Sequence, residues 1–223
     1  MKTSVILCAL LLAACSSKPL APSWQADAKD AIDAYTDDYL RGHGAAAEAD
    51  FARARRETAS TGRADLVAQV ELVRCAARAA SLEFDDCPGF AALAPDATAQ
   101  QRAYAAYLAG RWEGLDAALL PEQHRPVVAQ GRLPAAADPL AQLVAAGALL
   151  KAGRITPSDI ETATETASGQ GWRRPLLTWL GVSLERARAA GDTAAVERIE
   201  RRIALASGTS TPTTGASANG AVR

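Results

Sequence analysis

Apolar residues recur every three or four positions through most of the chain, and glycines interrupt this pattern at intervals. Alanine is abundant and runs of β-branched residues are few, a composition that favours helices over strands. A helical period followed by glycine is typical of amphipathic helices that end at C-cap glycines. The pattern predicts helices over residues 23–41, 45–59, 63–82, 98–109, 139–150, 157–168 and 172–190, and a last helix after Asp192.

Two of these stretches have the strongest core pattern. Residues 63–82 have apolar residues on two faces, so this helix should pack against partners on more than one side. Residues 140–150 are apolar except for Gln142, which predicts a buried helix, and Gly147 within it permits the close approach of a neighbour.

Capping signals define two helix starts. Asp138 is followed by Pro139, which suits an N-cap and the first helical position. Thr156 and Asp159 have the spacing of a capping box. The stretch between residues 110 and 134 is less regular: we expect a short helix that ends at Pro121, and little helix from residue 122 to 134 because two prolines limit it.

Short glycine turns between helices predict an all-α fold of antiparallel helical hairpins, either TPR-like or a compact α-helical array. Residues 104–119 and 184–203 resemble tetratricopeptide-type hairpins, although the spacing of the units is irregular. We expect a single α-helical domain over residues 23–206. Residues 207–223 contain no aromatic side chain and little to bury, which predicts a disordered tail.

The N-terminus has the order of an export signal: Lys2, then an uncharged apolar run from Val5 to Ala14, then Cys15. Leu12-Ala13-Ala14-Cys15 resembles the lipobox of bacterial lipoproteins. This resemblance implies that residues 1–14 are a signal peptide, that Cys15 receives lipid, and that residues 15–22 are a tether. The absence of aspartate after the cysteine implies the outer membrane, with the protein facing the periplasm. The alternative is an ordinary signal peptide that is cut elsewhere.

The stretch from Gly171 to Leu180 (GWRRPLLTWL) is similar to uncharacterised proteobacterial lipoproteins. Membership of such a family would imply a location and no mechanism.

The charges are balanced, with 24 basic and 25 acidic residues. There is no basic excess for nucleic acid and no polybasic stretch for anionic lipid. The expected contact with the membrane is therefore the N-terminal lipid alone.

The four cysteines lie in the expected signal peptide, at the lipidation site and in the helical domain. Cys8 leaves with the signal peptide and Cys15 carries lipid, which leaves Cys75 and Cys87 as a pair in an oxidising compartment, where disulfides persist. Two free thiols are the alternative. Two cysteines are too few ligands for a metal site without histidines nearby, so we expect none, and their spacing excludes a CxxC redox motif.

We find no catalytic motif and expect no cofactor. The chain has only two histidines and lacks the motifs of serine nucleophiles, zinc sites and phosphate loops. His124 is interpreted as a loop histidine, with a general base in a cleft as the alternative. Aspartates along residues 27–38 are interpreted as a solvated helix face and not as a cation site.

Aromatic and arginine side chains dominate interface hot spots. The candidates for partner binding are Tyr35, Tyr39, Trp172, Arg173 and Arg174, although Trp172 and Trp179 also lie at core spacing. The leading hypothesis is a non-enzymatic interaction or assembly module of the cell envelope, bound to an envelope protein. The alternatives are an enzyme that acts on peptidoglycan through two facing carboxylates, and a carrier of hydrophobic ligands.

Overall fold

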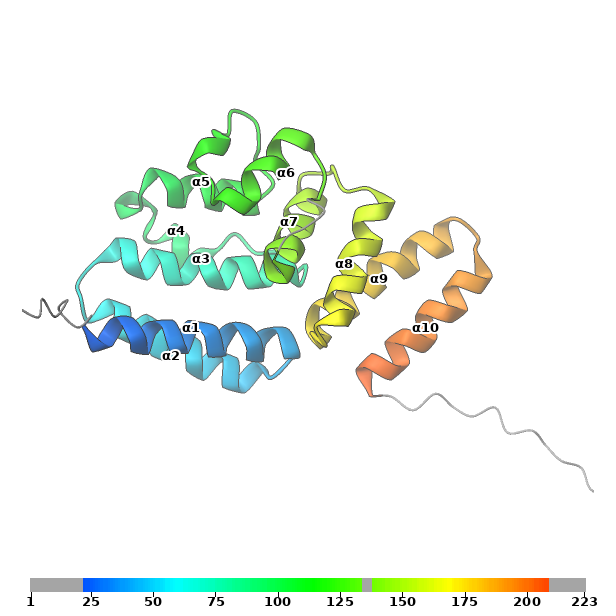
Figure 1. Ribbon diagram of the computed structural model, residues 1–223, viewed down its shortest axis with the longest axis horizontal. Helices are drawn as coiled ribbons and strands as arrows, with labels where there is room; N and C mark the ends of the chain where they lie inside the picture. Colours follow the sequence, from blue (N-terminus) through cyan, green and yellow to red (C-terminus); the bar gives the residue numbers. More distant parts are fainter. Residues whose placement is uncertain (1–21, 134–137, 209–223) are drawn as a thin grey trace, which may run out of the picture.

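The computed structural model describes residues 22–133 and 138–208, and within these ranges it contains α-helices, short 3₁₀ turns and no strand (Figure 1). The all-α prediction is confirmed. In chain order the helices are α1 (Ser23–Arg41), α2 (Gly44–Ala59), α3 (Ala64–Ala80), α4 (Pro88–Ala91), α5 (Ala99–Leu108), α6 (Arg125–Gln130), α7 (Pro139–Lys151), α8 (Pro157–Gly169), α9 (Arg173–Ala189) and α10 (Thr193–Ser207).

Helix α3 lies at the centre of the array. It packs on α1 and α2 on one side and on α5 and α7 on another (Figure 1). Accordingly, α3 contributes Val70 and Ala77 to a core shared with α1 and α2, and Leu72 and Ala76 to a larger core shared with α5, α7 and α8. The prediction of two apolar faces on this helix is confirmed.

The C-terminal half is a succession of neighbours, in which α7 packs on α8, α8 on α9, and α9 on α10. The indole of Trp179 on α9 is fully buried and donates a hydrogen bond to the carbonyl of Ala80 over 3.1 Å. This bond fixes α9 to the C-terminal end of α3. The last hairpin, α9 with α10, projects at one end of the molecule (Figure 1).

The predicted caps are present. Asp138 accepts a hydrogen bond from the backbone of Ala141, and Thr156 and Asp159 form a reciprocal capping box. Gly147 on α7 faces the backbone of Ala79 on α3 so closely that a Cβ there would lie 2.2 Å from the Ala79 oxygen. The close approach expected at this glycine is confirmed.

The stretch from residue 110 to 133 departs from the prediction in two places. The short helix expected before Pro121 is only a 3₁₀ turn over Ala117–Leu119. Conversely, α6 forms where little helix was expected, because Pro126 lies in its first turn, where the missing N–H costs no hydrogen bond. As a result, residues 104–119 are not a hairpin of two α-helices, whereas residues 184–203 do belong to the α9–α10 hairpin.

Candidate functional site

The expected lipidation site, Cys15, lies outside the described residues, as do the signal peptide and most of the predicted tether and tail. Among residues 22–133 and 138–208, no helix combines the length and apolarity that crossing a bilayer requires. The membrane anchor therefore stays a prediction from the sequence.

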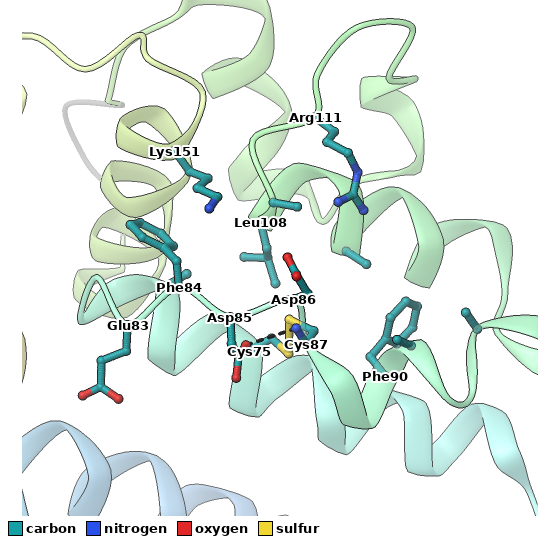
Figure 2. Close-up of a pocket in the computed structure, with 15 residues that line it drawn as sticks. Cys75, Glu83, Phe84, Asp85, Asp86, Cys87, Phe90, Leu108, Arg111 and Lys151 are labelled. Carbon is teal, nitrogen blue, oxygen red and sulfur yellow. Dashed lines mark hydrogen bonds between the residues drawn. A yellow bond between two sulfur atoms is a disulfide. The ribbon is translucent and has the colours of Figure 1, made fainter.

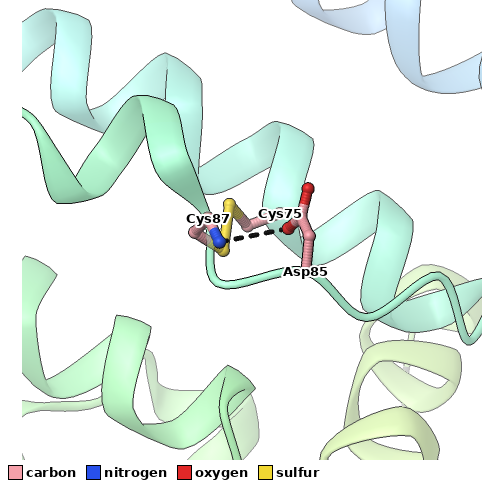
Figure 3. Close-up of side chains that lie close together, drawn as sticks. All are labelled: Cys75, Asp85 and Cys87. Atoms are coloured by element: carbon pink, nitrogen blue, oxygen red, sulfur yellow. Dashed lines mark hydrogen bonds between the residues drawn. A yellow bond between two sulfur atoms is a disulfide. The ribbon is translucent and has the colours of Figure 1, made fainter.

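The sulfur atoms of Cys75 and Cys87 lie at disulfide distance, with Cα atoms 5.8 Å apart (Figure 3). Cys75 is on α3, and Cys87 precedes α4 with a positive φ of 45°. The Asp85 carboxylate accepts a hydrogen bond from the Cys87 backbone N–H over 3.1 Å. The predicted disulfide is thus present, and it ties the segment of residues 83–87 to the central helix.

Asp85 also approaches the sulfurs. Its carboxylate oxygen and the two Sγ atoms lie within 4.8 Å of one another, a grouping that the sequence spacing did not suggest (Figure 3). Since the two sulfurs are bonded to each other, neither is a thiolate that can ligate a metal ion. We therefore propose no metal site at these three residues.

A cavity of about 350 Å³ opens beside the disulfide, between α3, α4, α5 and the C-terminal end of α7 (Figure 2). Its volume is at the lower end of the range for small-molecule clefts. Apolar side chains form much of its wall: Ala79, Phe84, Phe90, Ala94, Ala105 and Leu108. Charged groups also reach it: Glu83, Asp85, Asp86, Arg111 and Lys151.

A second cleft of about 520 Å³ contains His124. This histidine is only 2% exposed, and its Nδ1 lies 3.3 Å from the hydroxyl of Tyr107. Its ring also stacks on Tyr104. The interpretation of His124 as a polar loop residue is therefore wrong. Burial lowers its pKa to about 4, which keeps the imidazole neutral and makes it a weak general base at neutral pH.

A third hollow, of about 500 Å³, is an open groove between α8, α9 and α10. Its apolar lining includes Ile160 of α8 and Leu180 of α9, which are both buried, and Ile199 of α10, which is half-buried. Arg186, Arg198 and Arg202 line it with Glu161 and Glu165, and Arg202 is paired with Glu165 over 2.8 Å. The sequence did not indicate this groove, because its walls come from three separate helices.

Tyr35 and Tyr39 belong to the core between α1, α2 and α3, where they are 1% and 5% exposed. Burial raises the pKa of both phenols, so they stay neutral. Their rings are not at the surface, and we do not include them in the partner surface proposed below. Along the same helix, Asp27, Asp30, Asp33 and Asp37 are exposed, as a solvated face requires.

The three partner-binding candidates at the start of α9 have different environments. Trp172 is half-buried and packs against both cores. Arg174 donates to the carbonyl of Tyr39 over 2.8 Å and to Glu83 over 2.9 Å, and its guanidinium lies over the Tyr39 ring. Arg174 thus joins α9 to α1 and to the segment after α3. Arg173 is exposed and donates to the backbone of Ser207.

No protein-family model matches this chain, and no curated protein or solved structure is significantly similar to it. Function must therefore be inferred from the sequence signal and from the geometry of these three hollows.

Proposed function

We propose that this protein is a lipoprotein, held by Cys15 on the periplasmic face of the outer membrane, where its helical domain binds an envelope protein without catalysis. The lipobox-like Leu12-Ala13-Ala14-Cys15 supports the anchor. The groove between α8, α9 and α10 is the observation on which the binding role depends.

The groove exists because α10 packs on one side only. In the part of the chain that the structure describes, α10 has no buried residue, and its principal neighbour is α9. Its link to α8 is the ion pair between Arg202 and Glu165. Ile160 of α8 and Leu180 of α9 are only 4% and 1% exposed, so the accessible apolar surface of the groove comes mainly from the half-buried Ile199 of α10, within a rim of charged residues.

The charges around the groove favour an acidic partner. Arg186 and Arg198 form no ion pair with any described residue. Among the carboxylates of the groove, only Glu161 lacks an ion pair to a described residue. The hairpin of residues 173–208 has seven arginines and four carboxylates. We therefore assign to the groove a segment of an envelope protein that carries both acidic and apolar residues, since complementary charge gives specificity and fast association.

The enzymatic alternative requires two carboxylates that face each other across a cleft. In the cavity beside the disulfide, Glu83 is paired with Arg174 and Asp85 lies 3.3 Å from Arg78. Both carboxylates are thus engaged with arginines, and we propose no catalytic pair.

Metabolic labelling with a palmitate analogue tests the anchor. We expect label on the wild-type protein in the outer-membrane fraction, and none on the Cys15→Ala variant. An unlabelled wild-type protein would contradict the anchor without bearing on the groove.

A synthetic peptide tests the groove. The probe is a helical peptide with leucine at every third or fourth position and glutamates between, and its control has lysines in place of the glutamates. By fluorescence anisotropy we expect the acidic peptide to bind, and Arg186→Glu with Arg198→Glu to weaken it at least tenfold. The matched control changes Arg56 and Arg132, which are exposed and lie outside the groove. Equal binding of both peptides, or equal effects of both double variants, would refute the assignment.

A further inference from the structure

The cavity beside the Cys75–Cys87 disulfide has an apolar interior and charged groups at one side. Phe84, Leu108 and Phe90 bound it, and small alanines of α3, α4 and α5 leave its centre open (Figure 2). The disulfide forms part of the wall and holds the segment of residues 83–87 in place. An interior of this kind accommodates the apolar body of a small molecule.

Two cations extend over this interior. In Figure 2 the Lys151 side chain lies on the Phe84 side of Leu108 and the Arg111 side chain lies on the other side, and the two come from different elements. Neither forms an ion pair with a residue of the described ranges, and the nearest aromatic partner of Lys151 is the Phe84 ring at 5.2 Å. Both side chains are exposed, so they are free to reorient toward a ligand.

The three carboxylates at the cavity do not cancel these cations. Glu83 is bound by Arg174, and Asp85 faces Arg78. Asp86 is the one carboxylate of the cavity without an ion pair to a described residue. Two uncompensated positive charges against one negative charge leave the site with a net attraction for an anion.

Gly110 explains why the two cations line one cavity. It has a positive φ of 70°, and a Cβ at this position would lie 2.7 Å from the backbone carbon of Lys151. Only glycine permits such a conformation and such a contact without strain. The turn that carries Arg111 is therefore placed directly against the C-terminal end of α7, which carries Lys151.

We propose that this cavity binds small amphiphilic anions, namely molecules with one carboxylate on an apolar body. The apolar part occupies the space between Phe84, Leu108 and Phe90, while the carboxylate lies between Lys151 and Arg111. Asp86 limits the affinity for the ligand, because its negative charge repels the carboxylate. This binding site is separate from the α8–α10 groove and does not depend on the function proposed for it.

Isothermal titration calorimetry with three ligands of one chain length tests the charge requirement. Decanoate carries the anion, decanol lacks charge, and decylammonium carries the opposite charge. We expect the wild-type protein to bind decanoate at least tenfold more tightly than decanol, and decylammonium more weakly still. All titrations stay below the concentration at which the ligand forms micelles.

Variants locate the site. Arg111→Gln with Lys151→Gln should weaken decanoate at least tenfold and leave decanol unchanged, because only the anion is affected. Asp86→Asn should tighten decanoate severalfold. The matched control, Arg56→Gln with Arg132→Gln, removes two exposed arginines that do not line the cavity and should change binding less than twofold.

Ala105→Phe, which places a phenyl group in the cavity, provides a check independent of charge. It should abolish binding of decanoate while the circular dichroism spectrum stays helical. The proposal is overturned if wild-type protein gives no binding heat with decanoate, if decanol binds equally well, or if the Arg111 and Lys151 variant behaves like its control.

Discussion

The contact between α3 and α7 makes a glycine-to-alanine substitution destabilising where helix propensity alone predicts the reverse. In an exposed helix, Gly→Ala stabilises by about 1 kcal/mol. At Gly147 the added Cβ would lie 2.2 Å from the carbonyl oxygen of Ala79, whereas ordinary contacts begin near 3.4 Å. The two helices would have to separate by roughly 1 Å, and the neighbouring core residues would lose contact.

We expect the net effect of Gly147→Ala to be a loss of about 2 kcal/mol, because overpacking of a core costs up to about 3 kcal/mol and the propensity gain offsets about 1. For a domain of this size, that loss lowers the midpoint of thermal unfolding by about 4–8 °C. Circular dichroism at a helix band, with urea titration for the free energy of unfolding, gives both values.

Gly181→Ala is the matched control. Gly181 lies inside α9, and a Cβ there meets nothing within 4 Å. This substitution should raise stability by about 1 kcal/mol, since only the propensity changes. If both variants were stabilised, or if Gly147→Ala were neutral, the inferred backbone contact between α3 and α7 would be incorrect.

Three further predictions concern residues that the structure places in specific roles. Replacing Cys75 and Cys87 by serine should lower the free energy of urea unfolding by about 3 kcal/mol, the loop-closure value for their separation of 12 residues; unchanged stability would refute this. Burial lowers the pKa of His124 from 6.5 to about 4, so the contribution of the neutral imidazole to the free energy of unfolding is complete above pH 6.5 and is lost as the pH falls toward 4. We expect wild-type stability to fall by about 2–3 kcal/mol more than that of His124→Gln across this window, and parallel pH profiles would count against it. Arg174→Gln should cost about 2 kcal/mol in the same assay and Arg173→Gln less than about 0.5, because Arg174 is half-buried and bonds the carbonyl of the buried Tyr39, whereas Arg173 is exposed; equal losses of stability would refute this reasoning.

Most helices could be predicted from the sequence, because their signals are local. The cap at Asp138 and the capping box at Thr156 act within one turn, and the apolar period identifies the face that packs. The stretch around α6 could not be predicted in the same way. Leu120, His124 and Val127 are buried there by the surrounding helices, and this packing stabilises short turns that have little propensity of their own.

The disulfide could be predicted because the other two cysteines were assigned to the signal peptide and the lipid anchor. The sequence left Cys75 and Cys87 as the only cysteines of the expected mature domain, and the structure joins them. Nothing in the sequence indicated that Asp85 lies beside the sulfurs, because that position depends on how the segment after α3 turns back.

The sequence by itself determined the helical class and most helix limits, and it favoured the cysteine pair and a close approach at Gly147, because these features depend on periodicity, capping or composition. Only the tertiary structure decided which side chains share a site. Arg111 and Lys151 are distant in sequence and line one cavity because Gly110 fits against the end of α7, and the α8–α10 groove exists because α10 packs on one side. Such juxtapositions depend on contacts between elements, which leave no periodic or local trace in the chain.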